Sequence, residues 1–230
     1  MSGKIYDANT VPISQEVGRS HQRRILLLKT AVIQINKVPT RFSQNTIRWA
    51  TKLRRKATLY SNMDNNKSQT IHFIGIGGIG VSALARYYLS RGILVSGSDL
   101  APSETTGDLE KSGVKIHIGA HNKKNLPKNT NLVIHTAAVA KDNPELKEAK
   151  RRGLKIQSYA EALGELTKKY KTITVSGAHG KSTTTAMTAL VLEKGHCDPL
   201  VIVGTKVREF SDSNFRPGLG GYFVLEADEW

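Results

Sequence analysis

A short glycine-containing stretch in the second half of the chain limits most strongly what this sequence can fold into. Residues 172–175 are a β-branched run, Thr-Ile-Thr-Val, which predicts a buried strand. The turn Gly177-Ala-His-Gly-Lys-Ser-Thr183 follows, and a sequence typical of a helix then continues to Leu192. This order of strand, glycine turn, lysine, hydroxyl and helix indicates a phosphate-binding loop, because backbone N–H groups and the positive end of the helix then face the same point.

The residues of this loop have distinct expected roles at the phosphates of a nucleotide. Lys181 would reach the terminal phosphates, and the Ser182 hydroxyl would hold a magnesium ion. Only two residues separate Gly177 from Gly180, whereas the common loop has four. The alternative is an ordinary glycine turn before a helix. The residues expected around the phosphates are Gly177, Ala178, His179, Gly180, Lys181, Ser182 and Thr183.

A second glycine motif lies earlier in the chain. A strand expected at residues 71–74 runs into Gly75-x-Gly77-x-x-Gly80, and a helix at residues 81–91 and a strand at residues 93–99 follow. Asp99 lies about twenty residues after the glycines, as in dinucleotide-binding folds. The motif therefore predicts a Rossmann-like phosphate-binding turn without identifying the nucleotide. The alternative is that the glycines serve only the close packing of helix on strand.

Strands and helices alternate along the residues between the two motifs. Ser103 is a candidate N-cap, and Thr136 begins a run of small residues of the kind expected where a ligand approaches the backbone. The alternation predicts the α/β class, with a mostly parallel sheet covered by helices on both faces. The expected strands are residues 114–118, 132–135 and 154–156, and the expected helices are residues 103–112, 143–152 and 159–169.

An acidic run follows the last predicted strand. Residues 222–225 are apolar and lead into Glu226-Ala-Asp-Glu229, so Glu226 is the first candidate for a magnesium-holding carboxylate and Asp228 the second. Solvated acids at a strand end are the alternative. A buried strand is expected at residues 200–203 and a loop at residues 204–221. A second sheet of about three strands would leave an unpaired edge, so we expect a partial chain.

The net charge of +15 is unevenly distributed. Residues 1–70 hold 13 basic and 3 acidic residues, whereas residues 71–230 hold 21 and 16. The mildly basic second part suits an enzyme for anionic nucleotides and argues against nucleic acid as the partner of the folded part. The single cysteine, Cys197, excludes an internal disulfide, and no apolar run approaches the roughly 18–20 residues of a membrane span, so a reducing cytoplasm fits.

Residues 1–62 differ from the rest of the chain, since they are basic and poor in acids. The first core strand follows Met63 closely, which suggests Met63 as the natural start. The leader would then be extra translated sequence or a disordered extension. An organelle transit peptide and a nucleic-acid-binding arm are the alternatives.

Taken together, the two glycine motifs resemble those of the Mur ligase family of peptidoglycan synthesis. The resemblance covers residues 71–230, with Ala178 and Ser182 each standing where the family usually has threonine. His179 matches the loop histidine of the family. The segment Gly119-Ala-His121 has one residue more than the Gly-His pair usual in the family, so no ligand contact is assigned to His121. The residues that carry the resemblance are His72-Phe-Ile-Gly-Ile-Gly-Gly-Ile-Gly80, Gly97-Ser-Asp99, Asp142-Asn-Pro-Glu-Leu146, Ser176-Gly-Ala-His-Gly-Lys-Ser-Thr-Thr-Thr185 and Glu226-Ala-Asp-Glu229.

The resemblance implies an ATP-dependent amide ligase of the bacterial cytoplasm that joins L-alanine to UDP-N-acetylmuramate through an acyl phosphate. Residues 63–168 would bind the UDP-sugar, and residues 169–230 would begin an ATP-binding domain whose remainder, together with a third domain, is absent. Lys181 and His179 would be catalytic, and Ser182 and Glu226 would hold Mg²⁺. The residues implied at the UDP-sugar are Gly75, Gly77, Gly78, Gly80, Asp99 and Thr136.

Three alternatives remain at this point. A related recycling ligase attaches a preformed tripeptide to the same UDP-sugar and shares these motifs. The chain could instead be a nucleotide-binding fragment without activity. A nicotinamide-dependent dehydrogenase would explain the first glycine motif but not the second. The sequence makes no prediction of an oligomeric state.

Overall fold

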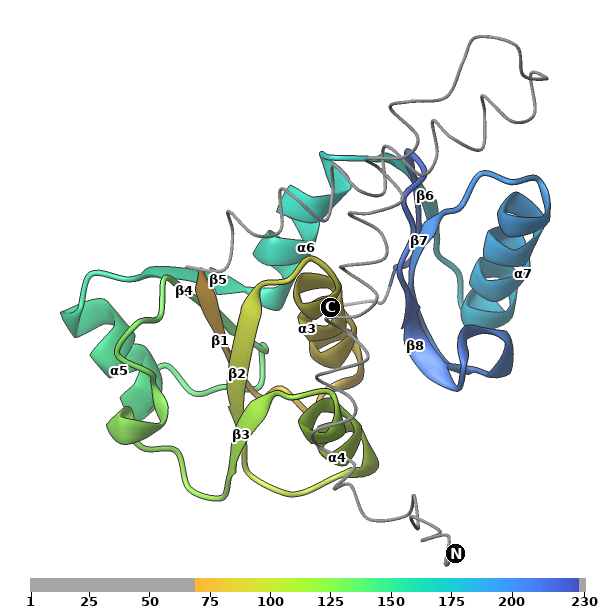
Figure 1. Cartoon of the computed structure of the whole chain (residues 1–230). Helices are drawn as coiled ribbons and strands as arrows, with labels where there is room; N and C mark the ends of the chain where they lie inside the picture. Colours follow the sequence, from red (N-terminus) through yellow and green to blue (C-terminus); the bar gives the residue numbers. More distant parts are fainter. Residues whose placement is uncertain (1–68, 228–230) are drawn as a thin grey trace, which may run out of the picture. The chain divides into compact units, whose positions relative to one another are not determined.

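The computed structural model describes residues 69–227, which form two sheets and the helices packed on them (Figure 1). The expectations for residues 1–62, Met63, Asp228 and Glu229 lie outside the described residues. All described residues belong to one compact unit. No described helix has the length and apolar character needed to cross a membrane.

The first sheet contains five parallel strands in the order β3-β2-β1-β4-β5. Its central strand is buried along its whole length, as expected for a parallel sheet with helices on both faces. This confirms the predicted α/β class. The strands are β1 (Thr70–Ile74), β2 (Leu94–Asp99), β3 (Lys115–Ile118), β4 (Leu132–His135) and β5 (Lys155–Ser158).

Alternation along β1 divides the core of this sheet between its two faces. Phe73 packs in a cluster with residues of three helices, α3 (Ile79–Ser90), α4 (Glu104–Lys111) and α6 (Tyr159–Thr167). Ile74 packs on the other face, with Leu146 and Ala149 of α5 (Pro144–Arg151) and with Leu126, which follows the short helix η1 (Lys123–Asn125).

Side-chain caps fix the starts of several of these helices. Ser103 accepts a hydrogen bond from the Thr106 N–H at 3.1 Å, which confirms its predicted role as the N-cap of α4. Asn143 caps α5 in the same way, with Pro144 in the first turn.

The second sheet has four strands in the order β6-β9-β7-β8. Strands β6, β9 and β7 are parallel, and β8 is antiparallel to β7. Helix α7 (Lys181–Lys194) covers one face, where Ala189 packs on Val201 and Val224. The strands are β6 (Lys171–Val175), β7 (Leu200–Val207), β8 (Ser213–Arg216) and β9 (Tyr222–Glu226).

The three predicted strands of this sheet are its three parallel strands, but the predicted loop at residues 204–221 was wrong in part, because it contains the end of β7 and the antiparallel strand β8. Strand β7 continues to Val207, and a short helix η2 (Arg208–Phe210) leads through a turn into β8. Ser211 and Asp212 make this turn with positive φ values of 61° and 53°. Because β8 is four residues long and mostly polar, its strand conformation depends on pairing with β7, which no local pattern reveals.

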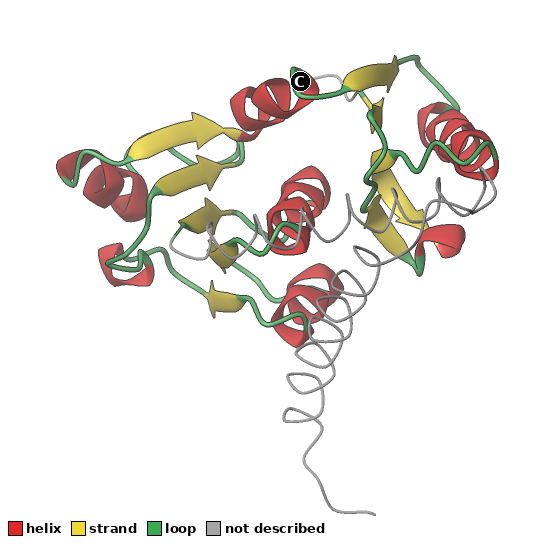
Figure 2. Cartoon of the chain, turned by 45° about the horizontal axis from the view of Figure 1, so that its top comes forward, coloured by secondary structure: helices red, strands yellow, loops and turns green. Residues whose placement is uncertain are grey.

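Helix α3 lies between the two sheets in both views (Figures 1 and 2). One side of α3 packs on the first sheet, while Leu200, Phe215 and Phe223 of the second sheet belong to the same apolar cluster as Leu84 of α3. The two sheets therefore share one continuous core through this helix.

Candidate functional site

The turn after β1 is held by backbone hydrogen bonds and opens onto the N-terminus of α3. The N–H groups of Gly75 and Ile76 both donate to the Ser98 carbonyl, at 2.8 and 3.1 Å. Gly78 is the N-cap of α3, and within the described residues no side chain caps this helix. The free N–H groups of the first turn therefore form a site where phosphate oxygens could be bound.

Asp99 lies at this turn, as the sequence predicts. Its Oδ2 accepts a hydrogen bond from the Gly77 N–H at 2.7 Å, and its carbonyl accepts one from the Gly119 N–H at 2.9 Å. The carboxylate therefore holds the glycine turn in place. A contact between Asp99 and the uridine side of a ligand stays a prediction.

Two of the glycines are required by close packing. A Cβ on Gly80 would lie 2.7 Å from the Tyr159 ring, so this glycine serves the approach of α6 to α3. A Cβ on Gly75 would overlap Cγ2 of Thr136, and Gly75 also has a φ of +77°. Close packing therefore accounts for two glycines of the motif, and Thr136 lies directly against the turn, whereas phosphate binding by the motif stays a prediction.

The Gly75→Ala substitution is expected to destabilise the fold, because it combines this overlap with a left-handed backbone conformation. We expect the free energy of unfolding to fall by about 1–3 kcal/mol, measured by denaturant titration. Gly107→Ala is the matched control, since a Cβ there has nothing within 4 Å and the residue lies inside α4. The control should be neutral or stabilising by about 0.5–1 kcal/mol, and equal losses in both variants would contradict this account.

The loop that the sequence predicts to bind phosphate connects β6 to α7, which confirms the predicted order of strand, turn and helix. Gly180 is the N-cap of α7 and has a left-handed φ of +74°, and Gly177 has a φ of +149°. The Lys181 ammonium donates to the Gly177 carbonyl at 2.8 Å, which closes the loop on itself. Ala178, His179 and Thr183 are exposed to solvent.

The structure brings Ser182 and Glu226 together from the start of α7 and the end of β9. Ser182 Oγ donates to Glu226 Oε1 at 2.9 Å, and Glu226 Oε2 accepts from the Gly204 N–H at 2.6 Å. A hydroxyl and a carboxylate are oxygen ligands of the kind Mg²⁺ prefers, and Mg²⁺ needs only one or two of them because phosphates and waters complete its shell. The pair therefore fits Mg²⁺. Among residues 69–227, no group of three or more His, Cys, Asp or Glu side chains forms a metal site.

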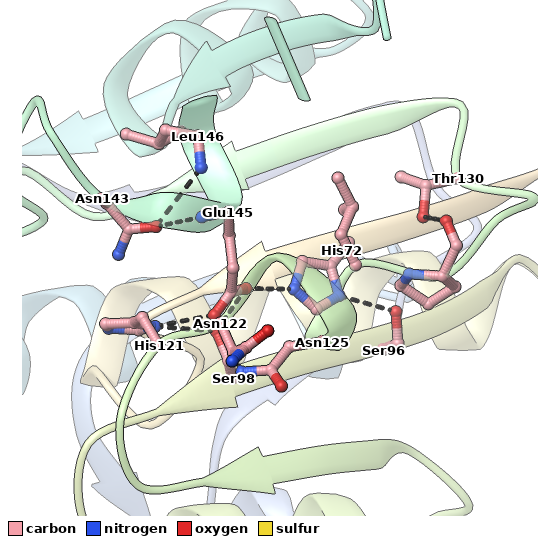
Figure 3. Close-up of polar contacts among 12 residues, drawn as sticks. His72, Ser96, Ser98, His121, Asn122, Asn125, Thr130, Asn143, Glu145 and Leu146 are labelled. Carbon is pink, nitrogen blue, oxygen red and sulfur yellow. Dashed lines mark hydrogen bonds and ion pairs between the residues drawn. The ribbon is translucent and has the colours of Figure 1, made fainter. Parts of the chain in front are cut away.

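A buried polar network on the α5 face of the first sheet was missed by the sequence analysis (Figure 3). Its centre is Glu145, whose side chain is fully buried. Oε2 lies 2.8 Å from His72 Nε2 and accepts a hydrogen bond from the Ser98 hydroxyl at 2.8 Å. Oε1 lies 2.8 Å from His121 Nδ1 and accepts one from the Asn125 amide at 3.1 Å.

The network ties α5 and the 119–125 segment to the strands that carry the glycine turn. His72 Nδ1 lies 2.9 Å from Ser96 Oγ, so both nitrogens of this buried ring have partners. Ser98 precedes Asp99 in β2, so Glu145 fixes the residue next to the one that holds Gly77. The ring of His121 is held by Glu145 through its Nδ1, which agrees with the absence of a ligand role for His121 in the prediction.

Burial and hydrogen bonding act in opposite directions on Glu145. Burial alone would raise the pKa of this carboxyl, but hydrogen bonds with His72, His121 and Ser98 outweigh it and lower the pKa to about 2. Glu145 is thus a carboxylate at neutral pH. A histidine within the apolar run of β1 was the one sequence signal of such a network, since a buried polar side chain needs a partner.

Comparison with known proteins agrees with the two glycine motifs. Residues 70–171 match the family model described as "Mur ligase family, catalytic domain". The UDP-N-acetylmuramate–L-alanine ligase of Acetivibrio thermocellus is 46% identical over 171 residues, which cover 74% of this chain and 36% of the relative. The ligase of the same name from Carboxydothermus hydrogenoformans is 45% identical over 163 residues. The chain therefore spans about a third of the length of these relatives, 36% and 35%.

Two solved structures that resemble this chain are also ligases named for UDP-N-acetylmuramate. The UDP-N-acetylmuramate–alanine ligase of Thermotoga maritima matches with a TM-score of 0.64 and 37% identity, over 68% of this chain and 36% of that one. The UDP-N-acetylmuramate:L-alanyl-γ-D-glutamyl-meso-diaminopimelate ligase of Neisseria meningitides matches with a TM-score of 0.64 and 25% identity, over 70% of this chain and 53% of that one.

Proposed function

We propose that this chain, whose residues 70–171 match the Mur ligase family, is part of an ATP-dependent ligase that joins L-alanine to UDP-N-acetylmuramate. The observation that carries the proposal is the contact of Ser182 with Glu226 beside the phosphate-binding loop. Relatives that are 43–46% identical are ligases for L-alanine, whereas the structure with the tripeptide name is 25% identical, so the recycling alternative is not favoured.

We assign the two nucleotides to the two glycine turns. Residues 63–168 would bind the UDP-sugar, with its diphosphate at Gly75, Gly77, Gly78 and Gly80 and with Asp99 and Thr136 beside it. Residues 169–230 would form the first part of the ATP-binding domain. Since UDP-sugars and ATP are cytoplasmic in bacteria, we expect the reaction there.

The chemistry requires a poor acyl donor to be activated. An oxygen of the lactyl carboxylate attacks the γ-phosphorus of ATP, ADP leaves, and an acyl phosphate results. The amine of L-alanine then attacks the acyl carbon, loses a proton, and phosphate leaves. Such phosphoryl transfer depends on in-line positioning and on offsetting negative charge.

The loop residues would position the nucleotide for this step. The N–H groups of residues 177–183 would bind the phosphates, and the Lys181 ammonium would exchange the Gly177 carbonyl for the terminal phosphates. Ser182 and Glu226 would hold Mg²⁺, which supplies positive charge to the phosphates when bound. Exposed His179 would assist the carboxylate or shape the loop.

Calorimetric titration of the chain with UDP-N-acetylmuramate, with ATP·Mg²⁺ and with NADH tests the proposal. We expect the first two to bind and NADH not to bind. Binding of NADH without binding of the UDP-sugar would overturn the assignment to a ligase.

The Ser182→Ala substitution is expected to weaken the binding of ATP in the presence of Mg²⁺ by about tenfold, because a hydroxyl ligand to a charged group is lost. With EDTA in place of Mg²⁺, the variant and the unaltered chain should bind ATP equally. Thr184→Ala, which removes an exposed hydroxyl two residues later in the same helix, is the matched control. A tenfold loss that persists in EDTA would argue against Ser182 as a metal ligand.

A further inference from the structure

Asn214 of β8 reaches out of the second sheet and into the first turn of α3. Its side chain is buried, with 2% exposed. The Nδ2 amide donates to the Ile79 carbonyl at 2.5 Å and to Ser82 Oγ at 3.1 Å. Ile79 and Ser82 lie directly after the glycine turn of β1. A strand of the proposed ATP-binding part thus contacts the helix that begins at the proposed UDP-sugar turn.

At the N-terminal end of α3, the Asn214 amide, the Ile79 carbonyl and the Ser82 hydroxyl are joined pairwise by hydrogen bonds. The Ser82 hydroxyl donates to the Ile79 carbonyl at 2.8 Å, and Asn214 donates to both groups. The other end of α3 is also fastened to the second part of the chain, because Arg91 Nη2 donates to the Tyr170 hydroxyl at 2.9 Å and to the Gly218 carbonyl at 3.2 Å. The direction of α3 is therefore set from the second sheet at both ends.

The first turn of α3 matters because its N–H groups point toward the proposed diphosphate site. A buried amide that fixes the carbonyl of Ile79 also fixes the peptide units next to it. Loss of Asn214 would leave the buried Ser82 hydroxyl without this donor and the Ile79 carbonyl with the Ser82 hydroxyl as its remaining side-chain donor, and would free the turn to shift. A shift of a few tenths of an ångström is enough to weaken hydrogen bonds to a phosphate.

We propose that Asn214 is a positioning residue for the diphosphate of the UDP-sugar, so that the ATP-binding sheet contributes to the affinity of the other nucleotide site. The inference rests on the proposed function. Strand β8 would then affect the binding of a ligand that it does not touch, because it acts through the first turn of α3.

The test compares Asn214→Ala and Ser82→Ala with the unaltered 230-residue chain by calorimetric titration with UDP-N-acetylmuramate and with ATP·Mg²⁺. We expect Asn214→Ala to bind the UDP-sugar about tenfold more weakly, and Ser82→Ala, which removes one of the two partners, to lose about threefold. Affinity for ATP·Mg²⁺ should stay within about twofold in both variants.

Lys206→Met is the matched control. Lys206 of β7 also joins the two parts of the chain, through ion pairs with Glu104 and Asp108 of α4 at 2.7 and 3.3 Å, but it does not contact the first turn of α3. The affinity of Lys206→Met for the UDP-sugar should equal that of the unaltered chain.

Each outcome decides the question. Unchanged affinity for the UDP-sugar in Asn214→Ala and Ser82→Ala overturns the inference alone. Equal losses for both nucleotides, or an equal loss in Lys206→Met, would show a general structural role and also overturn it. No binding of the UDP-sugar by the unaltered chain overturns the proposed function as well. If Asn214→Ala does not fold, as judged by circular dichroism, the result for Ser82→Ala decides.

Discussion

Replacing Glu145 with glutamine is expected to lower the free energy of unfolding by about 3 kcal/mol, the largest loss of stability among the substitutions considered. The glutamine keeps the shape of the side chain but replaces one acceptor oxygen by an amide that can only donate. The donors that now face the carboxylate from β1, β2 and the 121–125 segment cannot all find another acceptor in a buried place. Denaturant titration with a constant m-value measures the loss.

Glu165→Gln is the matched control for this substitution. Its carboxylate pairs with Lys168 on the surface of α6, where both side chains are more than half exposed. An exposed pair of this kind contributes little, so the control should unfold like the unaltered chain. Equal stability of the Glu145 variant and this control would contradict the importance of the network.

The same carboxylate also determines how stability responds to acid. Its folded pKa is lowered from 4.5 to about 2, so its contribution is complete above about pH 4.5 and is lost as the pH falls through about 2. In this window the free energy of unfolding of the unaltered chain should fall more steeply than that of Glu145→Gln, by up to about 1.4 kcal/mol per pH unit. Parallel curves for the two proteins would refute the low pKa.

Removing the Lys181 ammonium is expected to weaken binding of ATP·Mg²⁺ by roughly 10- to 100-fold, because a charge-assisted contact with the terminal phosphates is lost. The substitution is Lys181→Ala, and its effect is measured by calorimetric titration. Binding of UDP-N-acetylmuramate should not change, since the hydrogen bond of the Lys181 ammonium among residues 69–227 is to its own loop, at the Gly177 carbonyl.

Lys194→Ala, at the other end of the same helix, is the control for charge alone. This exposed lysine lies far along α7 from the loop, so affinity for ATP·Mg²⁺ should be retained. A similar loss in both variants would show that Lys181 acts through net charge and not as a phosphate ligand. Comparison of ADP with ATP then indicates whether the lost contact is to the γ-phosphate.

Local patterns were sufficient for much of the fold. Strand β4 occupies the predicted residues 132–135, and α4 begins after the predicted cap Ser103, because a buried apolar run and a capping hydroxyl are both readable within a few residues. The meeting of Ser182 with Glu226 was also predictable, because a phosphate loop and an acidic strand end lie at the same edge of a parallel sheet.

What the sequence could not reveal depends on partners far along the chain. Glu145 is 73 residues from His72 and looks like an ordinary first-turn acid of a capped helix. Strand β8 has one large apolar residue, Phe215, and its alternation is too short to be distinguished from a loop. Asn214 has a meaning only once β8 is placed against α3.

The burial of α3 has a consequence for modularity. Its residues from Val81 to Ser90 are all buried or partly buried, because the helix packs on both sheets. A cut between α6 and β6 would therefore uncover an apolar helix face on one piece and Phe215 and Phe223 on the other. The two proposed nucleotide-binding parts therefore share this apolar surface, and we expect either part, expressed alone, to aggregate unless the exposed apolar residues are replaced by polar ones.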